Sequence, residues 1–234
     1  MSTFQPTSRV IGGAGQNIQR GPGTGQRVWS DLSQIEMTKM ARLGSTLSRI
    51  APKPGALVFL NSERLSCKLN GTEAVVFSAF DASTHLQIAR IYFAESFTSA
   101  VDFVDFVRRK FPFSISRVRT SLESPFLSDP GRPSGERFTS HLEAQGVVHS
   151  MIGDHARDDL FSIFTRLSFV RVAGDSTQYS DSQDLMSEFI TYLFYHNNYR
   201  TLPSLKGWTP IKKLNSFDGY EDVEAFDPYT IAQS

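Results

Sequence analysis

The chain has 234 residues, of which 40% are hydrophobic, and its 24 Lys and Arg balance 24 Asp and Glu. This length fits one domain or one domain with arms, and zero net charge argues against a dedicated DNA-binding domain, although a local basic face stays open. The single Cys67 excludes an internal disulfide framework and a multi-cysteine zinc site, and no apolar run approaches the roughly 20 residues of a membrane span. We therefore expect a soluble, intracellular, cytoplasmic protein with no membrane partner.

Four segments follow one another along the chain. Residues 1–28 are rich in Gly, Gln, Ser and Thr and predict a flexible arm. Residues 29–53 predict a helix and a linker, and Gly44 is expected to break that helix. A compact domain is expected over 54–214, followed by a C-terminal tail over 215–234.

Within the compact domain, the apolar pattern predicts a layered α/β fold. Short apolar or alternating runs predict strands at 56–61, 74–80, 85–92, 115–120 and 147–150. Helical spacing predicts a helix capped by Thr98 or Ser99 and ending at Lys110, and further helices at 138–145, 158–172 and 184–196. Three antiparallel strands followed by two parallel ones give a mixed five-stranded sheet with helices on both faces.

Four short motifs lie within this pattern, in order. They are PGALVFLN at 54–61, FDAST at 80–84, FPFSI at 111–115 leading into TSLESPF at 120–126, and YHNNYR at 195–200 with GWTP at 207–210. Together they resemble the catalytic core of the retroviral-type integrase and transposase family, which has P-G-E-L-V-H-I-D, T-D-N-G-x-x-F, Y-N-x-x-R and G-x-T-P at similar spacing. The resemblance implies an RNase H-like fold and a place in DNA integration.

In that family, two Asp and one Glu hold two divalent metal ions, because hard cations need anionic oxygen ligands. The resemblance places the first Asp at Asn61 and the second at Ser121, and both side chains are neutral. Ungapped counting from His149 places the Glu at Phe164, and a gapped alignment places it at Asp159. We therefore expect a degenerate member that has lost metal-dependent strand transfer and needs no cofactor, with Mg²⁺ or Mn²⁺ required only if it is active.

Other carboxylates invite a metal-binding role, and each has a simpler structural interpretation. Asp81 lies at a hairpin turn, where Asp is favoured for local hydrogen bonds. Asp129 belongs to a loop rich in Pro and Gly, where surface charge is common. Asp158 and Asp159 close an acidic run that suits the start of a helix. A nuclease whose ligands have moved to these positions remains an alternative.

The basic residues of the fourth strand and of the helix before it could contact DNA phosphates or could be ordinary solvated surface. They are Arg108, Arg109, Lys110, Arg117 and Arg119. The candidate partners are DNA, an intact transposase, or a second copy of the chain. A third alternative is therefore a protein-interaction module that pairs with an intact transposase.

Overall fold

The computed structural model describes residues 34–69, 72–121, 125–126, 135–152, 167, 169–170 and 182–228. By its contacts the chain divides into two units, Met1–Asp31 and Leu32–Ser234, and the described residues all belong to the second unit. The predicted arm and most of the predicted helix at 158–172 lie outside these ranges. No helix within them is long and apolar enough to cross a bilayer.

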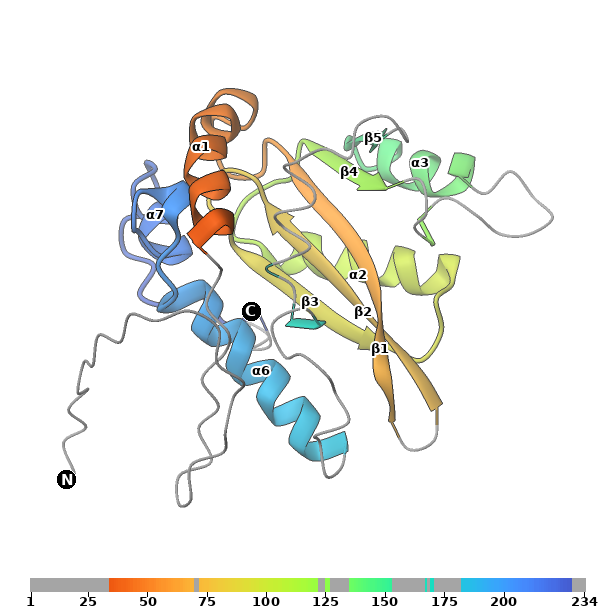
Figure 1. Cartoon of the computed structure of the whole chain (residues 1–234). Helices are drawn as coiled ribbons and strands as arrows, with labels where there is room; N and C mark the ends of the chain where they lie inside the picture. The colour runs from red at the N-terminus through yellow and green to blue at the C-terminus, as the bar shows by residue number, and fades with distance from the viewer. Residues whose placement is uncertain are drawn as a thin grey trace, which may run out of the picture. The chain divides into compact units, whose positions relative to one another are not determined.

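The described elements include three successive strands, then helices and strands in turn, and finally helices alone (Figure 1). In chain order they are α1 (Gln34–Ile50), β1 (Val58–Leu69), β2 (Thr72–Asp81), β3 (Gln87–Tyr92), α2 (Phe97–Lys110), β4 (Arg117–Ser121), α3 (Gly135–Glu143), β5 (Val148–Ile152), α6 (Ser182–Asn198), the 3-10 turn η2 (Pro203–Leu205) and α7 (Pro210–Leu214). All five predicted strands are present, as are the predicted helices at 98–110, 138–145 and 184–196.

The strands form one sheet in the order β3-β2-β1-β4-β5. Strands β1, β2 and β3 pair antiparallel, whereas β4 runs parallel to β1 and β5 runs parallel to β4. Three antiparallel strands are thus followed by two parallel ones, which confirms the predicted mixed five-stranded α/β sheet.

Each face of the sheet is covered by its own hydrophobic cluster, because successive side chains of a strand point to opposite faces. Leu60 belongs to the larger cluster, which we call the α2 face because it includes the buried residues of α2. Phe59, one residue earlier, belongs to the smaller cluster with Met40 and Leu47 of α1, and we call this the α1 face. Helices therefore cover both faces, as predicted.

Three local predictions were wrong. Gly44 does not break a helix but lies inside α1, where an added Cβ would come within 2.3 Å of the Ser204 carbonyl oxygen. Its small size thus allows α1 to approach η2 closely. Helix α2 is capped by Ser96, whose side chain accepts a hydrogen bond from the Ser99 amide, and not by Thr98 or Ser99. Strand β1 runs eight residues beyond the predicted end at Asn61, because polar residues continue it into a long hairpin with β2.

The end of α6 connects β3 to the C-terminal segment. The Asn197 side chain accepts a hydrogen bond from the Gln87 amide (2.7 Å) and donates one to the Gln87 carbonyl (2.8 Å). Asn198 makes the same two bonds to the backbone of Phe226 (2.8 and 3.0 Å). Two adjacent asparagines of the YHNNYR motif therefore fix an outer strand and residues of the predicted tail.

Candidate functional site

Neutral polar side chains lie side by side on the α1 face. Asn61 of β1 pairs with Ser78 of β2, and the parallel register Leu60↔Thr120 makes Ser121 of β4 its neighbour on the other side. Asn61 and Ser121 are half-buried, and Ser78 is buried. We call these three residues the Asn61 row. The structure thus brings together the two positions at which the family resemblance places the first two carboxylates.

Two charged residues flank this row on the same face. Glu63 lies two residues further along β1, about 7 Å from Asn61 along the strand. Arg119 precedes Ser121 by two residues, and its guanidinium carbon lies 5.9 Å from the centre of the Phe59 ring. Its Nε is also 3.5 Å from Ser150 Oγ on β5. The site therefore has one negatively charged and one positively charged side chain nearby, in place of a cluster of carboxylates.

Within the described ranges, no group of three or more His, Cys, Asp or Glu side chains is arranged to hold a metal ion. Glu63 is the carboxylate that sequence reasoning missed. Only the two-residue period of a strand, extended beyond Asn61, would have shown that it shares this face. The candidates for the third family position, Phe164 and Asp159, lie outside the described residues.

Asp81 is fully buried at the end of β2, where its carboxylate holds the backbone. Its Oδ1 accepts a hydrogen bond from the Gly55 amide (2.8 Å), and its Oδ2 accepts from the amide (2.8 Å) and the hydroxyl (2.7 Å) of Thr84. Burial raises the pKa of Asp81 to about 6, although these hydrogen bonds act to lower it. Asp81 therefore makes the local hydrogen bonds that the turn interpretation predicts. The other fallback metal ligands, Asp129, Asp158 and Asp159, lie outside the described residues.

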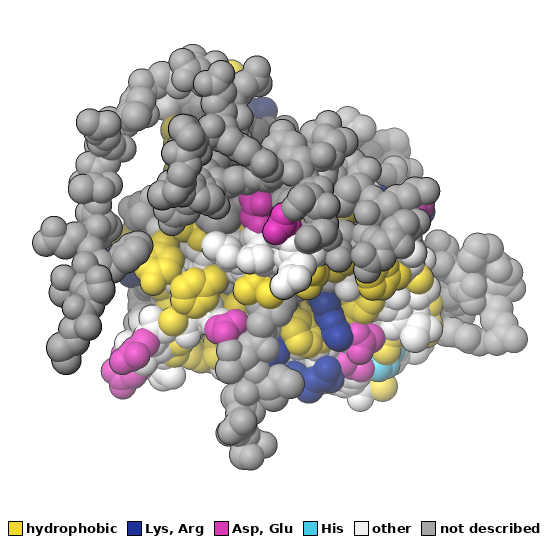
Figure 2. Space-filling model, turned by 90° about the horizontal axis from the view of Figure 1, so that it is seen from below, with side chains coloured by type: hydrophobic (Ala, Val, Ile, Leu, Met, Phe, Trp, Pro, Cys, Tyr) yellow, Lys and Arg dark blue, Asp and Glu magenta, His cyan; other side chains and the backbone are white. Residues whose placement is uncertain are grey.

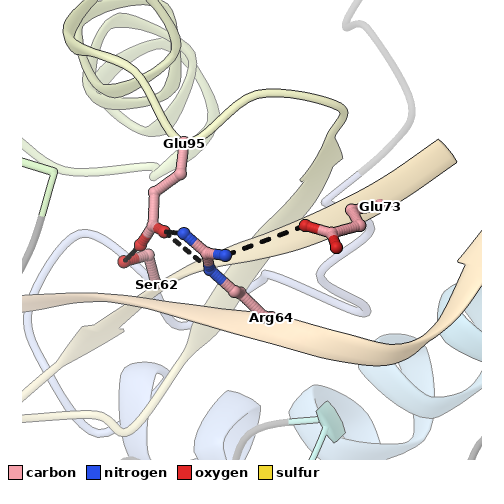
Figure 3. A network of polar contacts seen from close by, with 4 residues as sticks. All are labelled: Ser62, Arg64, Glu73 and Glu95. Atoms are coloured by element: carbon pink, nitrogen blue, oxygen red, sulfur yellow. Dashed lines mark hydrogen bonds and ion pairs between the residues drawn. The ribbon is translucent and has the colours of Figure 1, made fainter.

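A polar network lies at the edge of the α2 face (Figure 3). Arg64 donates to Glu95 through Nε and Nη2 (3.0 and 2.9 Å) and lies 3.7 Å from Glu73, and Ser62 also donates to Glu95 (3.1 Å). Ser62 and Arg64 alternate with Asn61 and Glu63 along β1, so these contacts lie on the face opposite the candidate site. They join the β1–β2 hairpin to the segment before α2.

The predicted basic cluster does not form one surface. Arg108, Arg109 and Lys110 end α2, which covers the α2 face, whereas Arg119 points to the α1 face from β4. Lys110 contacts the ring of Phe106, at 5.8 Å from its centre. On the face shown in Figure 2, basic and acidic side chains of the described residues lie next to one another among hydrophobic ones. This pattern gives no continuous basic stripe across the described part of that face.

No protein-family model and no curated protein matches the chain. Among solved structures, the magnesium complex of the HTLV-2 integrase catalytic core domain (dimeric form) is similar, with 13% identity and a TM-score of 0.48. The match covers 70% of this chain and 98% of that one. The simian T-cell lymphotropic virus intasome in complex with the PP2A regulatory subunit B56 gamma is also similar, with 13% identity and a TM-score of 0.47, over 64% of this chain. The chain spans about half, 51%, of the length of the chain that it matches there.

Proposed function

We propose that the chain is an integrase-core-like protein that keeps the scaffold of the DNA integration family for binding or assembly and lacks metal-dependent strand transfer. The observation that carries the proposal is the juxtaposition of Asn61 and Ser121. They directly follow the paired residues Leu60 and Thr120 on neighbouring parallel strands, where the family resemblance requires two carboxylates.

The chemistry of this row opposes a pair of metal ions. Two Mg²⁺ ions in a shared site carry four positive charges, and anionic oxygens must offset their repulsion. An amide oxygen from Asn61 and a hydroxyl from Ser121 supply dipoles but no negative charge. The guanidinium of Arg119 on the same face adds a positive charge.

The geometry disfavours the alternative in which Asp81 has become a metal ligand of a nuclease. Its two oxygens already accept three hydrogen bonds, and removing them would leave buried donors of Gly55 and Thr84 without partners. A metal-dependent nuclease built on Asp129, Asp158 and Asp159 remains the second candidate function. Pairing with an intact transposase is a form of the assembly role.

A gain-of-binding experiment tests the proposal. We expect no Mg²⁺- or Mn²⁺-dependent cleavage or strand transfer by the wild-type protein on duplex DNA. The double variant Asn61→Asp with Ser121→Asp should acquire Mn²⁺ binding in calorimetry, because two carboxylates then share one row. The matched control is Asn61→Asp with Ser121→Asn, which adds only one charge and should bind Mn²⁺ at least tenfold more weakly.

Wild-type activity that depends on either metal would overturn the proposal. Equal Mn²⁺ binding by the wild type and both double variants would show that the ions bind elsewhere and that this row is not the place where the site was lost.

A further inference from the structure

A pocket of about 380 Å³ lies away from the Asn61 row, between the end of α2 and the turn that follows α3. It is lined by Asp105, Arg108, Arg109 and Gln145. Ligand pockets commonly measure about 300–1,000 Å³, so this one suits a ligand about the size of a single nucleotide. Its lining contains two cations and one anion.

The backbone around the pocket is fixed by two helix ends. Helix α2 ends where the Phe111 amide donates to the Val107 carbonyl. Helix α3 ends at Glu143, and the turn after it contains Gly146, whose φ of +73° favours glycine, and Gln145, whose amide donates to the Leu142 carbonyl (3.0 Å). The Gln145 side chain is therefore presented from a tight turn and not from a long loop.

Hydrogen bonds orient three of the four lining side chains. Asp105 Oδ1 accepts from His141 Nε2 (3.0 Å) and from Gln145 Nε2 (3.1 Å), and Gln145 Oε1 accepts from Arg108. Burial acts to raise the pKa of Asp105, but the hydrogen bonds from His141 and Gln145 outweigh it and hold that pKa below its usual value. The pocket thus contains an ionised carboxylate and a guanidinium whose directions are already set.

Arg109 completes the lining from the last turn of α2. Its side chain is exposed, and within the described part of the chain it makes no hydrogen bond or ion pair. Guanidinium groups bind phosphate oxygens in a planar, bidentate geometry, and a second, oriented guanidinium beside the first lowers the ordering cost of binding. The two positive charges outnumber the single negative charge of Asp105.

We propose that this pocket binds a nucleotide through its terminal phosphate, with Arg108 and Arg109 on the phosphate oxygens and Asp105 accepting from a sugar hydroxyl. The carboxylate of Asp105 favours a ligand that carries a hydrogen-bond donor as well as a phosphate. A carboxylate beside a phosphate is repulsive unless the same ligand brings a hydrogen-bond donor to it. A free mononucleotide and the phosphorylated end of a nucleic-acid strand share this chemistry. The proposal goes beyond the proposed function, because it does not depend on the Asn61 row.

Titration of the full chain at low ionic strength tests the pocket, with adenosine 5′-monophosphate, inorganic phosphate and adenosine as probes. We expect the monophosphate to bind and adenosine to bind at least tenfold more weakly. The Arg109→Gln variant should weaken monophosphate binding at least tenfold. Arg49→Gln removes an exposed arginine of α1 outside the pocket and should leave binding unchanged. Asp105→Asn should reduce the preference for the monophosphate over inorganic phosphate.

Two single-stranded ten-nucleotide probes, one with a 5′-phosphate and one without, separate the two sources. Preference for the phosphorylated strand supports a strand end, whereas binding of the monophosphate without such a preference supports a free nucleotide. The proposal is overturned if the monophosphate does not saturate the protein at millimolar concentration, if inorganic phosphate binds equally well, or if Arg109→Gln and Arg49→Gln behave alike. None of these results bears on metal binding at Asn61 and Ser121.

Discussion

At the scale of single residues, the Asn61 row shows what a sheet gains when it carries no acidic cluster. Carboxylates held close together repel one another and raise the free energy of the folded state until a cation binds. The amide of Asn61 and the hydroxyl of Ser121 avoid that repulsion. The variant with aspartate at both positions is therefore expected to be less stable than the wild type without metal and to recover stability with Mn²⁺.

Asp81 is the residue whose role the structure defines most fully, and its removal gives a clear prediction. Asp81→Ala leaves three buried or partly buried donors, from Gly55 and Thr84, without their acceptor. An unsatisfied buried donor costs about 1–3 kcal/mol, so we expect the free energy of unfolding to fall by at least about 3 kcal/mol in urea titrations at pH 7.

The control for this variant is Glu224→Ala, which removes an exposed acid and should change the free energy of unfolding by less than about 0.5 kcal/mol. A loss of less than about 1 kcal/mol for Asp81→Ala would mean that the turn at Asp81 does not depend on its carboxylate. In that case the interpretation of Asp81 as a metal ligand would regain support.

At the scale of elements, the two asparagines at the end of α6 hold separate segments by the same geometry. Strand β3 lies at the edge of the sheet, and outer strands expose backbone groups that can pair with other chains. Asn197 occupies both backbone groups of Gln87, so helix α6 protects part of that edge. Asn198 does the same for Phe226, beyond α7.

Substituting each asparagine by alanine should therefore release a different amide. We expect Asn197→Ala to speed hydrogen exchange at the Gln87 amide and Asn198→Ala to speed it at the Phe226 amide, because each loses its side-chain acceptor. Each variant serves as the control for the other. Equal acceleration of both amides in both variants would show that the end of α6 opens as one unit and would contradict two independent contacts.

The elements also show how far a sequence can be interpreted. Alternation and apolar runs located all five strands, because burial of one or both faces leaves a period in the residues. The same signal could not show that β1 continues to Leu69, since that part of the hairpin is polar. The prediction that Gly44 breaks a helix was wrong because the role of this glycine depends on Ser204. Ser204 is 160 residues away in sequence and touches α1 only in the folded chain.

The candidate site shows the same limit. Motif spacing placed Asn61 and Ser121 at matching positions, and strand register alone shows that they are neighbours. Glu63 and the pocket beside Arg109 could not be predicted, because the first needed the length of β1 and the second needed the packing of α2 against the α3 turn. Local patterns predict elements, whereas sites depend on contacts between distant segments.

At the scale of the whole molecule, two buried histidines connect the sheet to the helices around it. His196 Nε2 on α6 donates to the His85 carbonyl (3.1 Å), and His85 Nδ1 lies 3.1 Å from the Ser204 hydroxyl at η2. Both rings are buried, at 1% exposure or less. Burial lowers the pKa of each histidine to about 3, and the charges of Lys213 near His85 and of Arg200 near His196 act in the same direction.

These shifts predict that the protein loses stability when the pH falls below about 6.5. The unfolded chain takes up a proton on each histidine near its ordinary pKa of about 6.5, whereas the folded chain keeps both rings neutral until about pH 3. Stability is thus fully present above about pH 6.5 and decreases as the pH falls. Each histidine lowers the free energy of unfolding by about 1.4 kcal/mol per pH unit below its unfolded pKa. Between pH 7 and pH 5 the two histidines together therefore lower it by about 4 kcal/mol.

Asp81 acts in the opposite direction, and the balance can be measured. Its pKa is raised to about 6, so the folded chain binds a proton that the unfolded chain binds only below about pH 4. Lowering the pH from 7 to 5 therefore restores about 1 kcal/mol at Asp81, so these three groups together lower the free energy of unfolding by about 2–3 kcal/mol in urea titrations. His149, whose pKa is also lowered by burial, acts in the same direction as the two buried histidines. His196→Gln keeps a donor near the His85 carbonyl but cannot titrate, so it should reduce the loss by about 2 kcal/mol. An unchanged pH dependence in that variant would show that His196 has the same pKa in the folded and unfolded chain, and would contradict the lowered pKa.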